Sequence, residues 1–310
     1  TGNGRRVVGV RLENGTEIQA KVVISNADPH MTFGEMMKPE DVPQKMQRRL
    51  NKTRYSLSAL SLFFAVDMDL KGAGMHSGNL WYAKSPNTES MYDLAVRPSL
   101  DNLKELPGCF LTCTTLKDPS ARRDGIHTLE SFAFVSYEAF NAWEATHTEH
   151  RPQAYEDLKS KMTDLLFERI NEVVPGIRDH VVFHALGTPL TNKYYVNSTM
   201  GNLYGIEKTI DQIDPFGFPI DPPIPGLYLC GAGTESHGVA GATCSGLAVA
   251  AKVLGCRQQE LLTEKGQNIR IYLCDKPDTW PEDLQPKQQR LSNLRAPSEV
   301  MHQEIWPIST

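Results

Sequence analysis

The sequence predicts a mixed α/β protein, and three stretches carry that prediction. Residues 57–66 alternate small polar and apolar side chains, which is typical of a strand with one buried face. A helical stripe of apolar residues runs over about 152–173. Residues 227–254 give a short apolar strand, a glycine-rich turn and a long helix of small residues.

The N-terminal residues predict a β-hairpin followed by a third strand. The hairpin strands are expected at 7–12 and 17–20, because Asn14 and Gly15 between apolar runs favour a two-residue turn with positive φ at both positions. The apolar run at 22–25 indicates a buried strand.

Two short helices are expected next. Asp28 and Pro29 suit the N-cap and first position of a helix that reaches about Met37. A second helix is expected to start at 41–43, and its exposed face is basic: Lys45, Arg48, Arg49 and Lys52. Such charge usually marks a solvated face, and the alternative is contact with anionic lipid headgroups.

Residues from about 35 to 186 predict a mixed sheet with covering helices. Strands are expected at 79–83, 109–116 and 128–135. The longest helix is expected to open at 151–152 and to end at 175–176, where Pro and Gly stop it. Segments 181–185 and 193–196 then lead the chain out of this region.

The stretch at 227–254 is the one around which the chain is organised. Prolines before Leu227 set off a buried strand at 227–230. A helix is expected over 241–254, and Gly255 suits the left-handed position that follows a helix.

The glycine turn between this strand and helix has a chemical use. The first amides of a helix lack partners within it, so an anion is stabilised there. Gly231 and Gly233 would let main-chain amides face a phosphate, and Gly238 and Gly241 would let the helix start lie against a flat group. The alternative is a tight corner whose small residues serve helix packing alone.

Composition narrows the function classes. The chain has 310 residues, 40% hydrophobic and 22% charged, which is ordinary globular material. Its formal net charge of -5 argues against nucleic-acid binding, which depends on Lys and Arg. No apolar run approaches the roughly 18 residues of a membrane span. The six cysteines suggest neither a disulfide framework nor a zinc ribbon, so an intracellular location fits best.

No metal site or catalytic residue is predicted. His147 and His150 match no zinc-ligand motif and lie in a polar linker, so surface histidines are the simpler interpretation. Ser245 lacks the glycine two residues earlier that a nucleophile elbow needs, and Cys244 is interpreted as a small helix residue.

Three motifs carry a family resemblance. Residues 225–234 with 238–242, residues 9–29, and the pair 187–191 and 201–205 resemble signatures of the phytoene desaturase and carotenoid isomerase family. That family lies within the amine-oxidase-like FAD-dependent flavoproteins. The resemblance covers only the C-terminal part of such proteins, because no strand with a GxGxxG turn corresponds to their N-terminal βαβ unit.

The resemblance implies an incomplete FAD-binding Rossmann-like domain with an inserted substrate domain. The expected division is 1–34 and 191–255 for the FAD-binding domain, 35–190 for the substrate domain, and 256–310 for a C-terminal extension. The extension is expected to be an appendage with a short amphipathic piece at 257–265 and an edge strand at 269–273.

The resemblance also assigns cofactor roles. The residues expected at the pyrophosphate and ribityl chain are Gly231, Ala232, Gly233 and Thr234, and those expected at the isoalloxazine are Val239, Ala240, Gly241 and Ala242. His237 stands between the two groups, either near the flavin or facing solvent.

The implied activity is hydride transfer from an apolar polyene to FAD. Eight residues of the inferred substrate domain could line an apolar cleft or fill a core: Leu57, Leu62, Phe63, Phe64, Trp81, Tyr82, Phe132 and Phe134. Expected partners are a carotenoid-like substrate, a membrane surface met peripherally in a plastid or bacterium, and a chain that supplies the remaining FAD half. The alternatives are a non-catalytic assembly subunit without the cofactor and a flavin amine oxidase.

Overall fold

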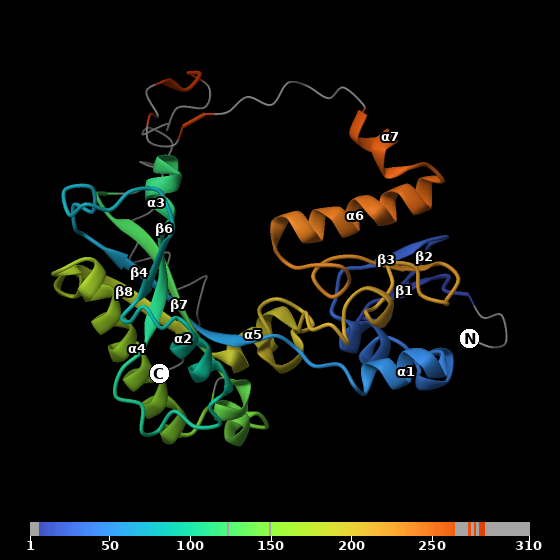
Figure 1. Cartoon of the computed structure of the whole chain (residues 1–310), viewed down its shortest axis with the longest axis horizontal. Coiled ribbons are helices and arrows are strands. Elements are labelled where there is room, and N and C mark those ends of the chain that lie inside the picture. Colours follow the sequence, from blue (N-terminus) through green and yellow to red (C-terminus); the bar gives the residue numbers. More distant parts are fainter. Residues whose placement is uncertain are drawn as a thin grey trace.

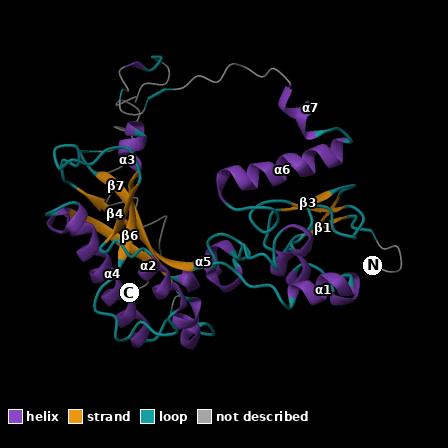
Figure 2. Cartoon of the chain, in the orientation of Figure 1, coloured by secondary structure: helices purple, strands orange, loops and turns teal. Residues whose placement is uncertain are grey.

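The computed structural model describes residues 6–122, 124–148, 150–263, 272–273, 276 and 279–282. Figure 1 shows a larger body built on a sheet with α4 against it, and a smaller body that contains β1, β2, β3, α1 and α6. Each body has its own cluster of buried apolar side chains. Figure 2 shows strands and helices in both bodies, so the predicted mixed α/β class is confirmed.

The larger sheet has five strands in the order β5-β6-β7-β4-β8. Their bounds are β4 Ser58–Val66, β5 Leu80–Ala83, β6 Gly108–Cys113, β7 His127–Val135 and β8 Val181–Gly187. Every neighbouring pair is antiparallel, so the predicted mixed sheet was wrong. Antiparallel strands with one buried face alternate apolar and polar side chains along the sequence, whereas strands of parallel sheets are buried on both faces and read as continuous apolar runs.

One face of this sheet packs on the long helix α4, Gln153–Val173, as the apolar stripe predicted. Leu60, Leu62 and Phe64 of β4 are buried on this side, and the Phe64 ring meets Phe167 of α4 edge to face at 5.5 Å. Gly176 follows α4 with φ +83°, consistent with the predicted stop. On the opposite face Phe63 of β4 is 47% exposed, and Tyr92 stacks on Phe134 of β7.

Shorter helical segments connect the strands of the larger body. They are α2 Glu89–Asp93, η3 Leu94–Val96, α3 Thr114–Lys117, η4 Pro119–Ala121, η5 Tyr137–Trp143, η6 Ile177–His180 and α5 Pro189–Val196. The strand expected to reach Leu116 ends at Cys113, because the chain turns into α3.

The hairpin of the smaller body joins β1, Gly9–Arg11, to β2, Glu17–Gln19. The prediction of a two-residue turn in this hairpin was wrong. The Leu12 amide donates to the Thr16 carbonyl at 2.9 Å, which leaves a three-residue loop, and in that loop only Gly15 has positive φ.

A two-stranded parallel sheet forms the centre of the smaller body. β3, Val23–Ser25, pairs with β9, Leu227–Leu229, although about 200 residues separate them. The helix α6, Gly238–Leu254, lies beside these strands (Figure 1) and ends at Gly255 with φ +69°, as predicted. The remaining helical segments of this body are η1 Met31–Glu35, η2 Pro39–Asp41, α1 Gln44–Leu50, η8 Asp214–Phe216 and α7 Gln258–Thr263. A further short segment, η7 Thr199–Gly201, packs on α5 and β4 of the larger body.

Two segments connect the bodies and run side by side. Residue Tyr55 bridges to Ile206, the Ser56 amide donates to the Gly205 carbonyl at 2.9 Å, and the Leu203 amide donates to the Leu57 carbonyl at 3.0 Å. Asp28 and Thr199 are also hydrogen-bonded. The Asp28 carboxylate accepts from the amide of Thr199 at 2.7 Å and from the hydroxyl of the same residue at 3.0 Å.

Within the described residues, no helix has the length and apolar character needed to cross a bilayer. The predicted amphipathic piece at 257–265 corresponds to α7 up to Thr263. The rest of that piece, residues 269–271 of the expected edge strand, and most of the extension lie outside the described residues.

Candidate functional site

The turn between β9 and α6 is locked onto the helix by buried hydroxyls. The Gly231 amide donates to Ser245 Oγ at 2.8 Å, and Ser245 Oγ donates to the Ala242 carbonyl at 2.8 Å. Thr234 Oγ1 donates to the Gly231 carbonyl at 2.8 Å. Ser245 and Thr234 are buried, so the chain itself fixes the shape of the turn.

Two of the predicted cofactor glycines are required by this packing. Gly231 has φ +86°, and a Cβ there would lie 1.9 Å from Asn26 Oδ1. A Cβ on Gly241 would lie 2.6 Å from the carbonyl carbon of Ser236. These glycines therefore shape the turn whether or not a ligand is present, and the Gly231 amide is already bonded inside the protein.

The next two residues of the turn, Ala232 and Gly233, are half-buried. In the described part of the chain, no hydrogen bond engages the amides of Ala232 and Gly233. The α6 start is exposed, with Val239 at 89% exposure, and the N-cap residue His237 makes no side-chain cap. Free amides next to a helix N-terminus are the arrangement that binds phosphate and other anions.

Lys208 adds a cation beneath this turn. Its ammonium donates to the carbonyl of Ala232 at 2.9 Å and to that of Thr234 at 3.0 Å. Burial lowers the pKa of Lys208. No carboxylate of the described residues pairs with Lys208, so an anionic group near the turn would be attracted to it. Sequence reasoning missed Lys208, because its role depends on contacts 24 and 26 residues away.

The open face of the larger sheet carries a row of rings that continues to the start of α6. We call these residues the aromatic ladder: Trp81, Tyr92, Phe110, Phe132, Phe134, Tyr204 and His237.

The ladder follows the strand register. Trp81 pairs with Phe110 across β5 and β6, and Phe110 pairs with Phe132 across β6 and β7, with ring centroids 5.1 and 4.6 Å apart. Phe132 and Phe134 are 5.6 Å apart.

The ladder ends next to the glycine turn. The ring of Tyr204 lies 6.5 Å from Phe134 and 5.1 Å from the ring of His237. Tyr92 lies to one side and stacks on Phe134 at 5.7 Å. The predicted cofactor turn and the apolar face of the sheet are thereby connected through ring contacts.

The predicted apolar residues divide between this face and the core. Trp81, Phe132 and Phe134 belong to the ladder, whereas Leu62 and Phe64 are buried against the α4 side. Phe63 is 47% exposed, Leu57 is half-buried, and Tyr82 donates to Glu172 of α4 at 2.7 Å. Sequence reasoning missed Phe110 and Tyr92; the strand register identifies Phe110.

The two linker histidines stack on each other, with ring centroids 5.7 Å apart. The described residues hold no group of three or more His, Cys, Asp or Glu side chains that could bind a metal.

Replacing Ser245 by Ala tests the lock of the turn. The Gly231 amide would lose its acceptor in a buried position, so we expect the variant to lose about 1–2 kcal/mol of unfolding free energy. Thr243→Ala is the control, since the Thr243 hydroxyl is exposed and bonds only the Val239 carbonyl of its own helix. Urea denaturation measures both. Equal stability of the Ser245 variant and the wild type would contradict the lock.

A family model and several curated proteins match most of this chain. A family model described as flavin containing amine oxidoreductase matches residues 1–254. The chain is 27% identical over 263 residues to all-trans-retinol 13,14-reductase of Danio rerio, covering 81% of this chain and 43% of that protein. It is 31% identical over 254 residues to chloroplastic prolycopene isomerase 2 of an Oncidium hybrid cultivar, covering 80% of this chain and 39% of that protein.

Among solved structures, an engineered putrescine oxidase aligns with a TM-score of 0.48 at 12% identity, covering 80% of this chain and 45% of that one. The chain therefore spans less than half the length of the relatives that it matches.

Proposed function

Because the chain belongs to the flavin-containing amine oxidoreductase family, we propose that it forms part of an FAD-dependent oxidoreductase that acts on an apolar polyene. Members of this family are FAD-dependent oxidoreductases and isomerases, and the chain is related to carotenoid isomerases and to a retinol reductase. The aromatic ladder is the observation that supports an apolar polyene as the substrate.

The turn fits a flavin nucleotide. We assign the pyrophosphate and ribityl chain to Gly231, Ala232, Gly233 and Thr234, and the isoalloxazine to Val239, Ala240, Gly241 and Ala242. The free amides of Ala232 and Gly233, the half-buried Lys208 and the exposed start of α6 support this assignment. In it, Gly231 shapes the turn and the neighbouring amides contact phosphate.

When bound, FAD supplies the acceptor for hydride, and the protein supplies binding, orientation and exclusion of water. The chain's contribution is the ladder, whose rings give an apolar surface that leads to His237 and Tyr204. A polyene would be held there through buried area at roughly 25 cal/mol per Å², without a charged anchor. No catalytic residue is assigned.

Other residues complete the FAD site in this proposal. They come from sequence beyond these 310 residues or from a second chain, since the chain spans less than half the length of these relatives. The two-stranded sheet and the exposed apolar residues at the C-terminal end of α6, Val253 and Leu254, offer surfaces for such a partner. A non-catalytic assembly subunit that lacks the cofactor is the alternative.

A polyene dissolves in bilayers, so the proposed enzyme meets its substrate at a membrane surface by peripheral contact. The intracellular, membrane-peripheral location belongs to this proposal. The prolycopene isomerases among the relatives are chloroplastic by name, which makes a plastid one candidate compartment.

The test uses the full-length polypeptide purified with its flavin. We expect it to oxidise or isomerise a carotenoid-like polyene that is presented in vesicles or detergent, as product chromatography would show. A small water-soluble primary amine serves as the competing substrate. Turnover of the amine with no product from any polyene would favour the amine oxidase alternative. A full-length polypeptide without flavin would favour the assembly subunit.

A further inference from the structure

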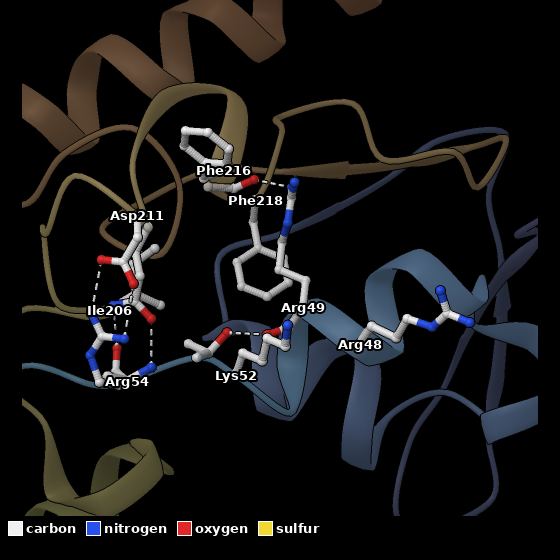
Figure 3. Close-up of a pocket in the computed structure, with 11 residues that line it drawn as sticks. Arg48, Arg49, Lys52, Arg54, Ile206, Asp211, Phe216 and Phe218 are labelled. Atoms are coloured by element: carbon white, nitrogen blue, oxygen red, sulfur yellow. Dashed lines mark hydrogen bonds and ion pairs between the residues drawn. The ribbon is translucent and has the colours of Figure 1, made fainter.

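A pocket of about 660 Å³ lies between α1 and the loop at 206–218, on the smaller body (Figure 3). Four of its lining side chains are cationic, Arg48, Arg49, Lys52 and Arg54, and one, Asp211, is anionic. This local excess of positive charge stands in a chain whose formal net charge is -5.

Two of these cations have no internal partner. Within the described residues, neither Arg48 nor Lys52 makes an ion pair or a side-chain hydrogen bond, and both side chains are exposed. Arg48 lies in the last turn of α1, Lys52 lies two residues beyond the end of that helix, and both line the pocket. In Figure 3, Arg48 extends from α1 without a dashed line.

The third cation is fixed in place. Arg49 donates to the carbonyls of Gly217 and Pro215, the latter at 3.0 Å, and its guanidinium lies 6.0 Å from the ring centre of Phe218. Burial lowers the pKa of Arg49. Its partners are carbonyls, so they leave its charge unneutralised and available to an anion.

Arg54, the fourth cation, does not add free positive charge to the pocket. It donates to Glu207 at 2.8 Å and to Asp211 at 2.9 Å, so carboxylates neutralise its charge. The free charge in the pocket therefore belongs to Arg48, Arg49 and Lys52. Phe216, 59% exposed, adds an apolar surface beside them.

We propose that this pocket binds a phosphate group through Arg48, Arg49 and Lys52. A guanidinium offers paired donors that match phosphate oxygens, and an ammonium adds a point charge. The group is carried either by a soluble phosphate compound or by the headgroup of an anionic lipid. This site is separate from the glycine turn, and the proposal does not depend on the function proposed above.

Two arms of one experiment separate the sources, both with the full-length polypeptide. Isothermal titration with inorganic pyrophosphate tests the soluble source. Sedimentation with phosphatidylcholine vesicles, with and without phosphatidylglycerol, tests the lipid source. The test variant is R48Q/K52Q. The control is K45Q, which removes a charge from the same helix at an exposed residue that does not line the pocket.

We expect R48Q/K52Q to weaken binding about tenfold or more in at least one arm, and K45Q to change it less than about twofold. Loss in the pyrophosphate arm identifies a soluble ligand, and loss only in the phosphatidylglycerol arm identifies a lipid headgroup. Absence of binding in both arms, or equal weakening by K45Q, would overturn the proposal. Because the substituted side chains are exposed, circular dichroism melting should show all variants folded.

Discussion

Gly205→Ala is expected to destabilise the protein by about 3 kcal/mol and to displace the proposed cofactor turn. Gly205 has φ +77°, a conformation that alanine adopts at a cost. A Cβ there would lie 2.8 Å from the Ala232 carbonyl oxygen and 2.9 Å from its carbon, and backbone atoms cannot rotate away as a side chain can.

Gly246→Ala is the matched control for Gly205→Ala. Gly246 lies inside α6, and a Cβ there would meet nothing within 4 Å. Alanine is favoured over glycine in a helix interior by about 1 kcal/mol, so the control should be neutral or more stable. Urea denaturation and flavin content would be measured for both. A Gly205→Ala protein as stable as the wild type, with full flavin content, would contradict the close approach of Gly205 to the Ala232 backbone.

Phe132→Ala is expected to weaken polyene binding at least about tenfold, because it removes the central ring of the aromatic ladder. Phe132 touches Phe110, Trp81 and Phe134, at ring distances of 4.6, 5.5 and 5.6 Å. Its loss would remove the closest ring contacts of Phe110 and Phe134 and leave Trp81 as the link between them. Affinity would be measured by titrating the full-length polypeptide with a polyene in detergent.

A second pair of variants separates the ladder from general surface apolarity. Tyr92 and Tyr194 are exposed to nearly the same extent, 56% and 57%, but only Tyr92 belongs to the ladder. Tyr92→Ala should weaken polyene binding and Tyr194→Ala should not. Equal effects of the two would mean that polyenes bind exposed aromatic surface without preference.

Elements that are specified by neighbouring residues could be predicted from the sequence. The apolar stripe of α4, the alternation in β4 and Gly255 after α6 each act within a few residues, and the structure confirms all three. The strand expected over 109–116 was wrong at its end. Thr114 and Thr115 favour strands, but the Thr115 hydroxyl bonds His127 Nδ1 at 2.8 Å and accepts from the Thr128 amide at 3.2 Å, which holds α3 in place.

Features that depend on long-range contacts were not predictable in the same way. The antiparallel order of the sheet and the ladder require the pairing of β5, β6 and β7, which no single strand specifies. The glycines of the turn were recognised in the sequence from their motif, and their role in cofactor binding stays a prediction. The structure adds that Gly231 and Gly241 are required by Asn26 and Ser236, so part of that motif serves the turn itself.

The most direct test of the central claim, that the glycine turn holds a flavin facing the aromatic ladder, is the flavin absorption spectrum of the full-length polypeptide during titration with a polyene in vesicles, without oxygen. The account predicts a saturable spectral change that weakens in Phe132→Ala and persists in Tyr194→Ala. A spectrum that no polyene alters, together with bleaching by a small water-soluble amine, would contradict it.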